Sequence, residues 1–285
     1  MNHTPVLEAT GRDVVAGYRL EAVLGRGRHS TVYLARDLRG DRRVALKLAT
    51  VRDLAGASAA LAIGQEFAAL SALAHPHILR VFDHGMEDCT AFMAMEYANG
   101  GPLARRTGAL GQATVLSLLA QAAGGLAWLH RRGWVHRDLK PANLLLRADG
   151  SLALGDLGSA ARRGHGGVTP GTMIGTPLYA APEQTEGAPA HPTADVYALG
   201  ACLYELLCGS PPYPGETSIE LLGQHLLAPV PRLAPEHARW QPLLDAMLAK
   251  DPAGRPADGA AVLGQLRAIG LWLPDDAANE PRCES

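Results

Sequence analysis

Hydrophobic positions divide the chain into two parts with different periodicities. Between Tyr18 and Met95, apolar residues form short runs broken by glycines and charged turns, as in β-strands. From Ala113 onwards, apolar residues recur every three or four positions, as on the buried side of helices. The pattern predicts an α+β protein with a small sheet first and a larger, mainly helical part after it.

The first part should hold an antiparallel sheet of five strands and one main helix. The expected strands are 18–24, 31–36, the short apolar run 44–47, 78–82 and 91–95. The helix is expected over 57–73, where Glu66 is the only acid. Gly100 and Gly101 then interrupt the pattern, which suits a hinge.

Five helical patterns follow the hinge. They are expected over 113–131, 196–207, 219–227, 240–248 and 257–269. The stretch 196–207 is apolar on almost every face and should therefore lie at the centre of this part. Segment 159–180 has little periodicity and is expected to be a long loop, either functional or disordered.

Composition narrows the classes of function. The formal net charge of −2 does not suggest nucleic acid or an anionic membrane as a partner. The four cysteines show no metal-ligand spacing and are expected to be reduced thiols of a cytoplasmic protein. Residues 1–17 do not resemble a signal peptide, and the most apolar run, 196–208, is too short to span a bilayer. We therefore expect no membrane anchor.

The polar run His136–Asn143 carries most of the candidate chemistry. It lies between a helical pattern and the apolar Leu144–Leu146. Most polar loops only connect two elements, but this one has companions at compatible spacing before and after it.

The glycine hairpin is the first companion. Gly25 and Gly27 lie between two expected strands, where a backbone without side chains can approach a polyphosphate and offer its N–H groups. Alone, such a hairpin is more often only a tight turn. A dinucleotide-binding fold is disfavoured because the glycines do not open a helix.

Lys47 and Glu66 form a second candidate pair. A lysine at a strand end is usually solvated, and a single glutamate on a helix is usually a surface residue. If the strand lies beneath the glycine hairpin, however, the Lys47 ammonium could hold phosphate oxygens, and Glu66 could orient it.

Together these elements form an ordered series. In chain order they are the glycine hairpin, Lys47, Glu66, the Asp138–Asn143 loop, Asp156-Leu157-Gly158, Ala181-Pro182-Glu183, Asp195 and Arg255. The series resembles the eukaryotic-like (Hanks-type) serine/threonine protein kinases, which occur in bacteria as well as eukaryotes. The resemblance covers roughly residues 18 to 270, and the Ala-, Arg- and Gly-rich composition suggests a bacterial source.

The resemblance implies a two-lobed protein kinase fold. It places an N-terminal extension at 1–17, the N-lobe at 18–95, the hinge at 96–101, the C-lobe at 102–270 and a tail at 271–285. The implied activity is transfer of the γ-phosphoryl group of ATP to Ser or Thr hydroxyls of proteins, including the kinase itself through a transient homodimer.

The resemblance also implies a role for each catalytic residue. Asp138 would accept the proton of the substrate hydroxyl, and Lys140 would steady the γ-phosphate. Asn143 and Asp156 would hold Mg²⁺, or Mn²⁺ in its place, because these ions prefer oxygen ligands. Lys47 would hold the α- and β-phosphates.

A nucleotide site follows from the same resemblance. Met95 would stand behind the adenine, and backbone groups of Glu96 and Ala98 would bond the base. The remaining residues expected to line the site are Leu24, Gly25, Arg26, Gly27, Val32, Ala45 and Leu145.

Arg137 before Asp138 implies control by phosphorylation of the activation loop. A phosphate on Thr172, or on Thr169, could pair with this arginine and order the loop. The alternative is that both threonines are only solvated loop residues. Lys140 and Gly175-Thr176 resemble the Ser/Thr rather than the Tyr branch, and Glu183 and Arg255 resemble its buried ion pair.

The chain departs from the family pattern at a few positions. Ser30 replaces the third glycine and Leu157 the phenylalanine of the magnesium loop, and neither change removes a charged catalytic group. Pro102 and Ala142 replace acids of basophilic kinases, so no strong demand for arginine before the target is expected. A pseudokinase that only binds partners, and a small-molecule phosphotransferase of related fold, remain as alternatives.

Overall fold

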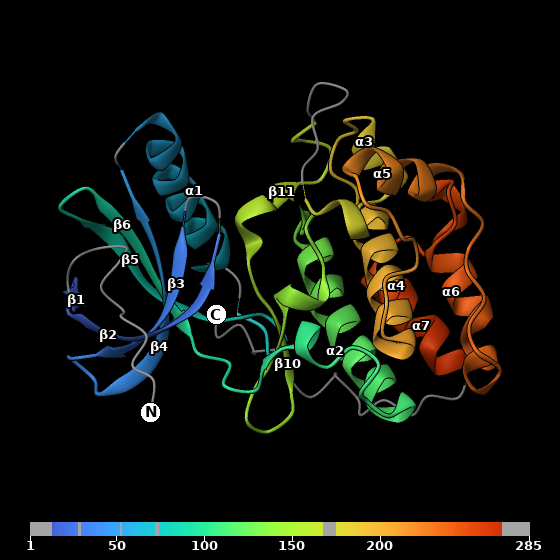
Figure 1. Ribbon diagram of the computed structural model, residues 1–285, viewed down its shortest axis with the longest axis horizontal. Coiled ribbons are helices and arrows are strands. Elements are labelled where there is room, and N and C mark those ends of the chain that lie inside the picture. Colours follow the sequence, from blue (N-terminus) through green and yellow to red (C-terminus); the bar gives the residue numbers. More distant parts are fainter. Residues whose placement is uncertain (1–12, 28–29, 52, 72–73, 168–174, 270–285) are drawn as a thin grey trace, which may run out of the picture.

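The computed structural model describes residues 13–27, 30–51, 53–71, 74–167 and 175–269 and consists of two lobes (Figure 1). The first lobe is an antiparallel sheet in the order β1-β2-β3-β4-β6-β5, with one helix beside it. Its elements are β1 (Val14–Val15), β2 (Tyr18–Arg26), β3 (Thr31–Asp37), β4 (Arg42–Thr50), α1 (Leu54–Ser71), β5 (Val81–Glu87) and β6 (Thr90–Glu96). The predicted α+β class and two-lobed kinase fold are confirmed.

Two details of this sheet differ from the prediction. The two-residue β1 adds an edge strand beside the five expected ones, and the fourth expected strand begins at Val81 rather than Ile78. Ile78 instead forms a parallel bridge with Leu154 of the second lobe. The backbone hydrogen bonds Leu79 N to Leu154 O (2.8 Å) and Leu154 N to His77 O (2.9 Å) complete this contact. The connection after α1 is therefore tied to the larger lobe.

The second lobe is mainly helical, with short strands on the side facing the first. Its helices are α2 (Gln112–Arg131), α3 (Pro182–Thr185), α4 (Pro192–Cys208), α5 (Ser218–Leu227), α6 (Gln241–Met247) and α7 (Gly259–Ala268). Its strands are β7 (Gly101–Pro102), β8 (Trp134–Val135), β9 (Leu144–Leu146), β10 (Leu152–Leu154) and β11 (Ala161–Arg162). They form the sheets β10-β9-β7 and β11-β8.

Capping residues explain where several of these helices begin and end. The Asp258 carboxylate accepts a hydrogen bond from Ala261 N at the start of α7, and Thr217 and Glu220 form a capping box at the start of α5. Helix α4 has Pro192 in its first turn and ends at Gly209, whose φ of 81° is accessible to glycine at little cost.

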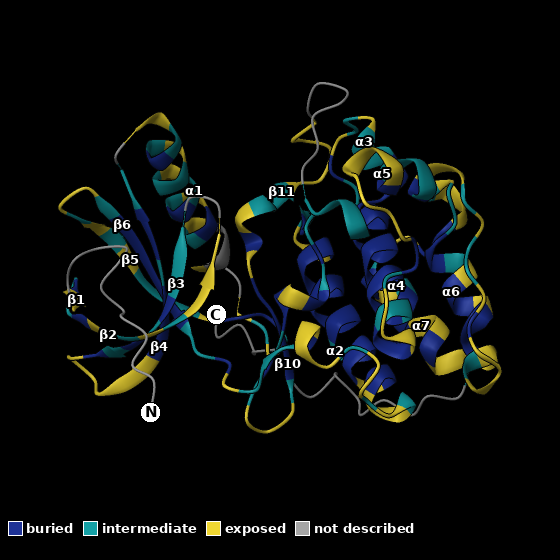
Figure 2. Cartoon of the chain, viewed as in Figure 1, coloured by how far each residue is buried: buried dark blue, intermediate teal, exposed yellow. Residues whose placement is uncertain are grey.

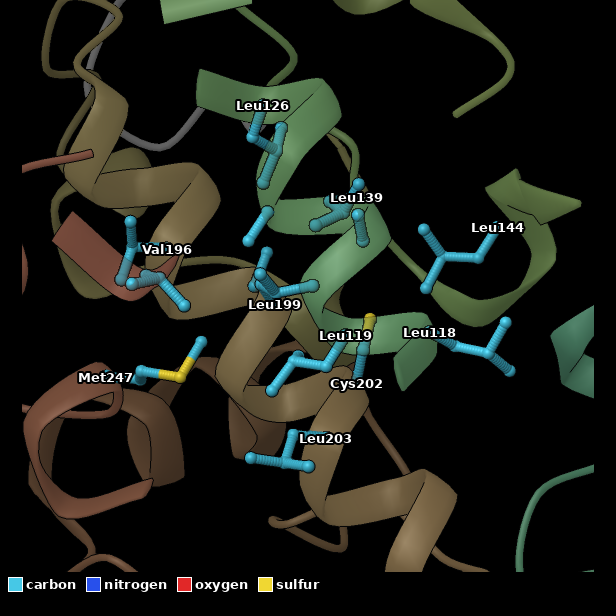
Figure 3. Close-up of a cluster of buried hydrophobic side chains, with 14 of the residues drawn as sticks. Leu118, Leu119, Leu126, Leu139, Leu144, Val196, Leu199, Cys202, Leu203 and Met247 are labelled. Atoms are coloured by element: carbon cyan, nitrogen blue, oxygen red, sulfur yellow. The ribbon is translucent and has the colours of Figure 1, made fainter. Parts of the chain in front are cut away.

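Helices α2 and α4 form the centre of the larger lobe, and both are buried along most of their length (Figure 2). Their leucines interdigitate with Met247 of α6 and with Leu139, which is 1% exposed (Figure 3). Leu139 lies between Asp138 and Lys140, so this apolar contact fixes the polar loop to the core. The prediction that 196–207 lies at the centre of this lobe is confirmed.

Within the described ranges, α2 is the one helix whose length and apolar composition would allow it to cross a membrane. Of its most apolar stretch, 78% is buried inside the lobe, as expected for a central helix.

A buried histidine on α5 should make stability depend on pH. The His225 ring is buried, and its Nδ1 shares a hydrogen bond with the Tyr197 hydroxyl (2.9 Å). Burial, and then the charge of Lys250, lower the pKa of His225 to about 4. Its ordinary pKa is about 6.5, so between these values the unfolded chain binds a proton that the folded chain does not. The contribution of His225 to the free energy of unfolding should therefore be fully present above pH 6.5. It should be lost as the pH falls towards 4, which lowers the free energy of unfolding by roughly 3 kcal/mol.

The measurement is denaturant unfolding across this pH range for the wild type and His225→Gln. Glutamine can still bond Tyr197 but does not titrate, so its stability should depend less steeply on pH. Parallel curves for the two proteins would rule out His225 as the source.

Candidate active site

Lys47 and Glu66 meet at the side of the small sheet that carries α1. Lys47 lies in β4 and its Nζ is 2.6 Å from Glu66 Oε2 on α1. The Glu66 side chain is only 2% exposed. The predicted pair therefore exists, and its burial excludes the solvated surface roles that were the alternatives for both residues.

Asp156 brings the second lobe to the same ammonium group. Its Oδ1 is 3.0 Å from Lys47 Nζ, although 109 positions separate the two residues. Burial alone would lower the pKa of Lys47, but the charges of Glu66 and Asp156 raise it above its ordinary value. Lys47 is therefore a cation shared by two carboxylates from different lobes.

The backbone at Asp156 is strained. Its φ of 55° and ψ of 68° lie in the left-handed region, which non-glycine residues enter at a cost. Burial raises the pKa of its carboxyl, but the charge and hydrogen bond of Lys47, together with the charges of His136 and Lys140, hold the pKa below its usual value. Asp156 is thus an ionised carboxylate at the junction of the lobes. Leu157, next in the chain, is buried in the core of the larger lobe, so the apolar position is filled.

A second polar group surrounds Asp138. Lys140 Nζ is 2.7 Å from Asp138 Oδ2 and 2.8 Å from Thr176 Oγ1, and the Thr176 hydroxyl donates to Asp138 Oδ1 at 2.8 Å. The predicted contact of Thr176 with both residues is therefore present. A carboxylate held in this way has a fixed orientation and stays available as a proton acceptor.

Asn143 is buried beside Asp138 and fits a role as a metal ligand. Its Nδ2 donates to the Asp138 backbone oxygen at 2.8 Å, which leaves the amide oxygen as the atom able to face a cation. No group of three or more His, Cys, Asp or Glu side chains among the described residues could hold a metal ion. A hard cation could take oxygens from Asn143 and Asp156 and complete its shell with phosphate and water, as Mg²⁺ commonly does.

Asp195 supports the backbone just before Asp138. Its carboxylate accepts hydrogen bonds from the backbone N–H groups of His136 (2.7 Å) and Arg137 (2.8 Å) and contacts His130 Nε2 at 2.9 Å. These bonds support Arg137 in a left-handed conformation, with φ of 68°. The sequence pattern includes Asp195 but does not indicate which groups it binds. Its place in the first turn of a buried helix was the available signal.

The Asp138 group also contacts the segment leading into α3. Gly175 has a φ of 99°, and a Cβ there would lie 2.8 Å from the Arg137 carbonyl oxygen, so only glycine fits. Farther along, both oxygens of Glu183 bind Arg255, at 2.7 and 2.9 Å. The predicted ion pair is therefore present and bidentate.

The apolar residues predicted to line the base site gather in one place. Ala45, Met95 and Ala98 are buried in a single cluster, against which Val32 and Leu145 pack. Glu96 is the last residue of β6, and its backbone N–H donates to Arg80 O (2.8 Å). Val32 and Leu145 come from different lobes, so the cluster spans their junction.

The glycine hairpin closes as predicted. Gly25 pairs with Val32, Arg26 pairs with Thr31, and Gly27 N donates to Ser30 O at 2.8 Å. A Cβ at Gly25 would meet no atom within 4 Å, so the space beside this backbone is open, while Leu24 is exposed. An open, side-chain-free backbone edge suits a phosphate chain.

Arg137 binds the backbone of the long loop 159–180 at two positions. Its Nε donates to Ser159 O (2.7 Å) and its Nη1 to Gly166 O (2.6 Å), and it lines a small cavity with Glu183 and His191. Thr169 and Thr172, its predicted phosphorylated partners, lie outside the described residues.

The two lobes, the shared lysine and the held aspartate define a class of protein, the two-lobed ATP-dependent phosphotransferases. Comparison with known proteins is consistent with this class, because the family described as "Protein kinase domain" matches residues 18–264. The chain belongs to the protein kinase family. Membership implies the use of ATP and a divalent metal ion in general.

Relatives at similar distance come from mycobacteria and corynebacteria. Serine/threonine-protein kinase PknL of Mycobacterium bovis is 34% identical over 275 residues, covering 93% of this chain and 69% of PknL. Serine/threonine-protein kinases drp72 of Corynebacterium efficiens is also 34% identical, covering 89% of this chain and 51% of the relative. For PknB of Mycolicibacterium smegmatis the identity is 34%, with shares of 88% and 42%.

Proposed function

We propose that this protein transfers the γ-phosphoryl group of ATP to serine and threonine hydroxyls of proteins. The observation that carries the proposal is the position of Lys47, bonded to Glu66 of its own lobe and Asp156 of the other. A pseudokinase that has lost transfer is disfavoured, because Lys47, Asp138 and Asp156 are all present and arranged together. The names of the bacterial relatives support the same activity.

Each polar side chain has a separate task in this proposal. Asp138 orients the substrate hydroxyl and accepts its proton, while Lys140 offers positive charge beside it. Lys47 binds phosphate oxygens, and Glu66 keeps its ammonium group directed. Asp156 and Asn143 hold Mg²⁺ or Mn²⁺, which neutralises phosphate charge when bound. Placement and charge neutralisation are what phosphoryl transfer most requires.

Adenine would lie in the apolar cluster at the junction of the lobes. Val32 and Ala45 would cover one face and Leu145 the other, with Met95 behind. The backbone of Glu96 and Ala98 would bond the base, and the hairpin Leu24–Gly27 would cover the phosphates.

Autophosphorylation is a further part of the proposal. It would place phosphate on Thr172 or Thr169 within a transient homodimer, and the phosphate would pair with Arg137. Arg137 already bonds Ser159 and Gly166, which precede the two threonines in the same loop. A phosphate bound to Arg137 would therefore attach the phosphorylated threonine to this part of the loop. The free cysteines Cys89, Cys202 and Cys208 favour a cytoplasmic location. The net charge of −2 favours protein rather than nucleic acid as partner.

The test is incubation of the purified chain with labelled ATP and a generic protein substrate. Label should reach phosphoserine and phosphothreonine with Mg²⁺ or Mn²⁺ and be absent when a chelator removes the metal. Label on tyrosine alone, or ATP binding without transfer, would contradict the proposal. Mapping of the labelled kinase should find phosphate at Thr172 or Thr169, and a map without either removes the autophosphorylation part.

A further inference from the structure

Arg147 connects three segments that meet at the hinge. It directly follows β9, and its Nε and Nη2 both bond the carboxylate of Glu96, the last residue of β6 (Nη2 to Oε2, 3.1 Å). Its Nη1 donates to the backbone oxygen of Pro76 (2.6 Å), between α1 and β5, and lies 3.4 Å from Ser151 Oγ. One guanidinium group thus joins the hinge, the connection after α1 and the β9–β10 turn.

The Arg147–Glu96 pair is largely removed from water. The side chains are 21% and 23% exposed, and Glu96 Oε2 also accepts a hydrogen bond from Arg80 N at 3.3 Å. Burial raises the pKa of Glu96, but the hydrogen bonds and charge of Arg147, together with those of Arg80, hold the pKa below its usual range. The contact is bidentate and charge-assisted, and its planar fork suits arginine better than lysine.

The pair is adjacent to the atoms that would hold the base. Glu96 lies two residues before Ala98, and Gly100 N donates to Leu146 O at 2.9 Å. The hinge is therefore bound both to β9 and to Arg147, the residue after it. Leu145 precedes Arg147 by two positions and packs against the same apolar cluster as Ala98. A shift of Glu96 would therefore change the distance between the hinge backbone and the Leu145 face.

We propose that Arg147 is a positioning residue for the adenine ring. It fixes the Glu96 side chain and, through it, the distance between the peptide groups of the hinge and the Leu145 side chain. This inference rests on the proposed ATP site. Among the described residues, the hydrogen bonds of the Arg147 side chain go to Glu96, Pro76 and Ser151 and not to Asp138. Its contribution should therefore appear in nucleotide affinity and not in the rate of transfer.

The test measures binding of adenosine to Arg147→Ala by calorimetry without metal. Adenosine lacks phosphates and reports on the base site alone. Its dissociation constant should rise about tenfold, roughly the effect of one lost charged hydrogen bond. KM for ATP should rise by a similar factor, with kcat and KM for the protein substrate unchanged. Arg147→Lys should recover part of the affinity.

Two further variants sharpen the result. Glu96→Gln should weaken adenosine binding in the same direction, and adding it to Arg147→Ala should cause little further loss, because both remove one interaction. The matched control is Arg36→Ala on β3, two strands away from β6. It breaks ion pairs with Glu21 (3.1 Å) and Asp41 (2.8 Å) and should leave adenosine binding unchanged.

Unchanged adenosine binding in Arg147→Ala would overturn the inference, and so would a lower melting temperature as its only effect. A fall in kcat with KM for ATP unchanged would also overturn it. If Arg147→Ala does not fold, Arg147→Lys and Glu96→Gln decide by the same readouts. Failure of the wild type to bind adenosine or transfer phosphate would instead refute the proposed function, and the inference with it.

Discussion

Replacing Asp138 by asparagine should slow phosphoryl transfer strongly while the protein stays folded and still binds ATP. Asparagine has nearly the same shape and can accept the Thr176 hydroxyl bond, now 2.8 Å long, but it cannot take up the substrate proton. A positioned general base contributes about 10²- to 10⁴-fold to a rate, so kcat should fall by that range. Labelled ATP gives the rate, and calorimetry gives the affinity.

The control is Asp41→Asn, an exposed aspartate that pairs with Arg36 in the smaller lobe. It loses the same charge far from the site and should transfer phosphate as the wild type does. Equal labelling by Asp138→Asn and wild type would show that Asp138 is not the proton acceptor. Loss of ATP binding in Asp138→Asn would point to disruption of the site as a whole.

Replacing Arg255 by methionine should produce the largest loss of stability. The Arg255 side chain is 0% exposed, and besides Glu183 its N–H groups bond the carbonyl oxygens of Ala249 (2.6 Å), Thr193 (3.1 Å) and Lys250 (2.9 Å). Methionine would leave a carboxylate and three carbonyls without their donor. Removing one partner of a buried pair costs about 3 to 5 kcal/mol, measured as the free energy of unfolding in denaturant.

Two variants separate the charge from the hydrogen bonds. Glu183→Met combined with Arg255→Met removes the uncompensated carboxylate, so part of the stability should return, but the three carbonyls stay unsatisfied. Arg43→Met, at an exposed pair, should change stability little. If Arg255→Met unfolds at the same denaturant concentration as Arg43→Met, the buried pair does not have the proposed importance.

The sequence predicted the charged centre well because short motifs specify it. Lys47, Asp138 and Asp156 each stand in a local pattern whose chemistry is readable from neighbouring residues. The helices were also accessible, since their apolar positions repeat with a helical period over ten or more residues. Both kinds of signal are local.

Contacts between distant segments that no motif connects were not predictable. Asp195 is 58 and 59 positions from the amides it accepts, and Arg147 is 51 positions from Glu96. Strand β5 was placed too early because Ile78 and Leu79 are its most apolar neighbours, yet they pair with β10. Two-residue strands such as β8 and β11 are too short to show any periodicity.

The backbone contact between residues 77–79 and β10 attaches the chain after α1 to the larger lobe. Backbone hydrogen bonds join His77 and Leu79 to Leu154, so this connection is held on the larger lobe. Glu66 lies on α1, while Lys47 lies in β4 of the sheet. Because the Lys47 ammonium binds Glu66 and Asp156 at once, a change in the spacing of the two lobes would alter the charge environment of this lysine.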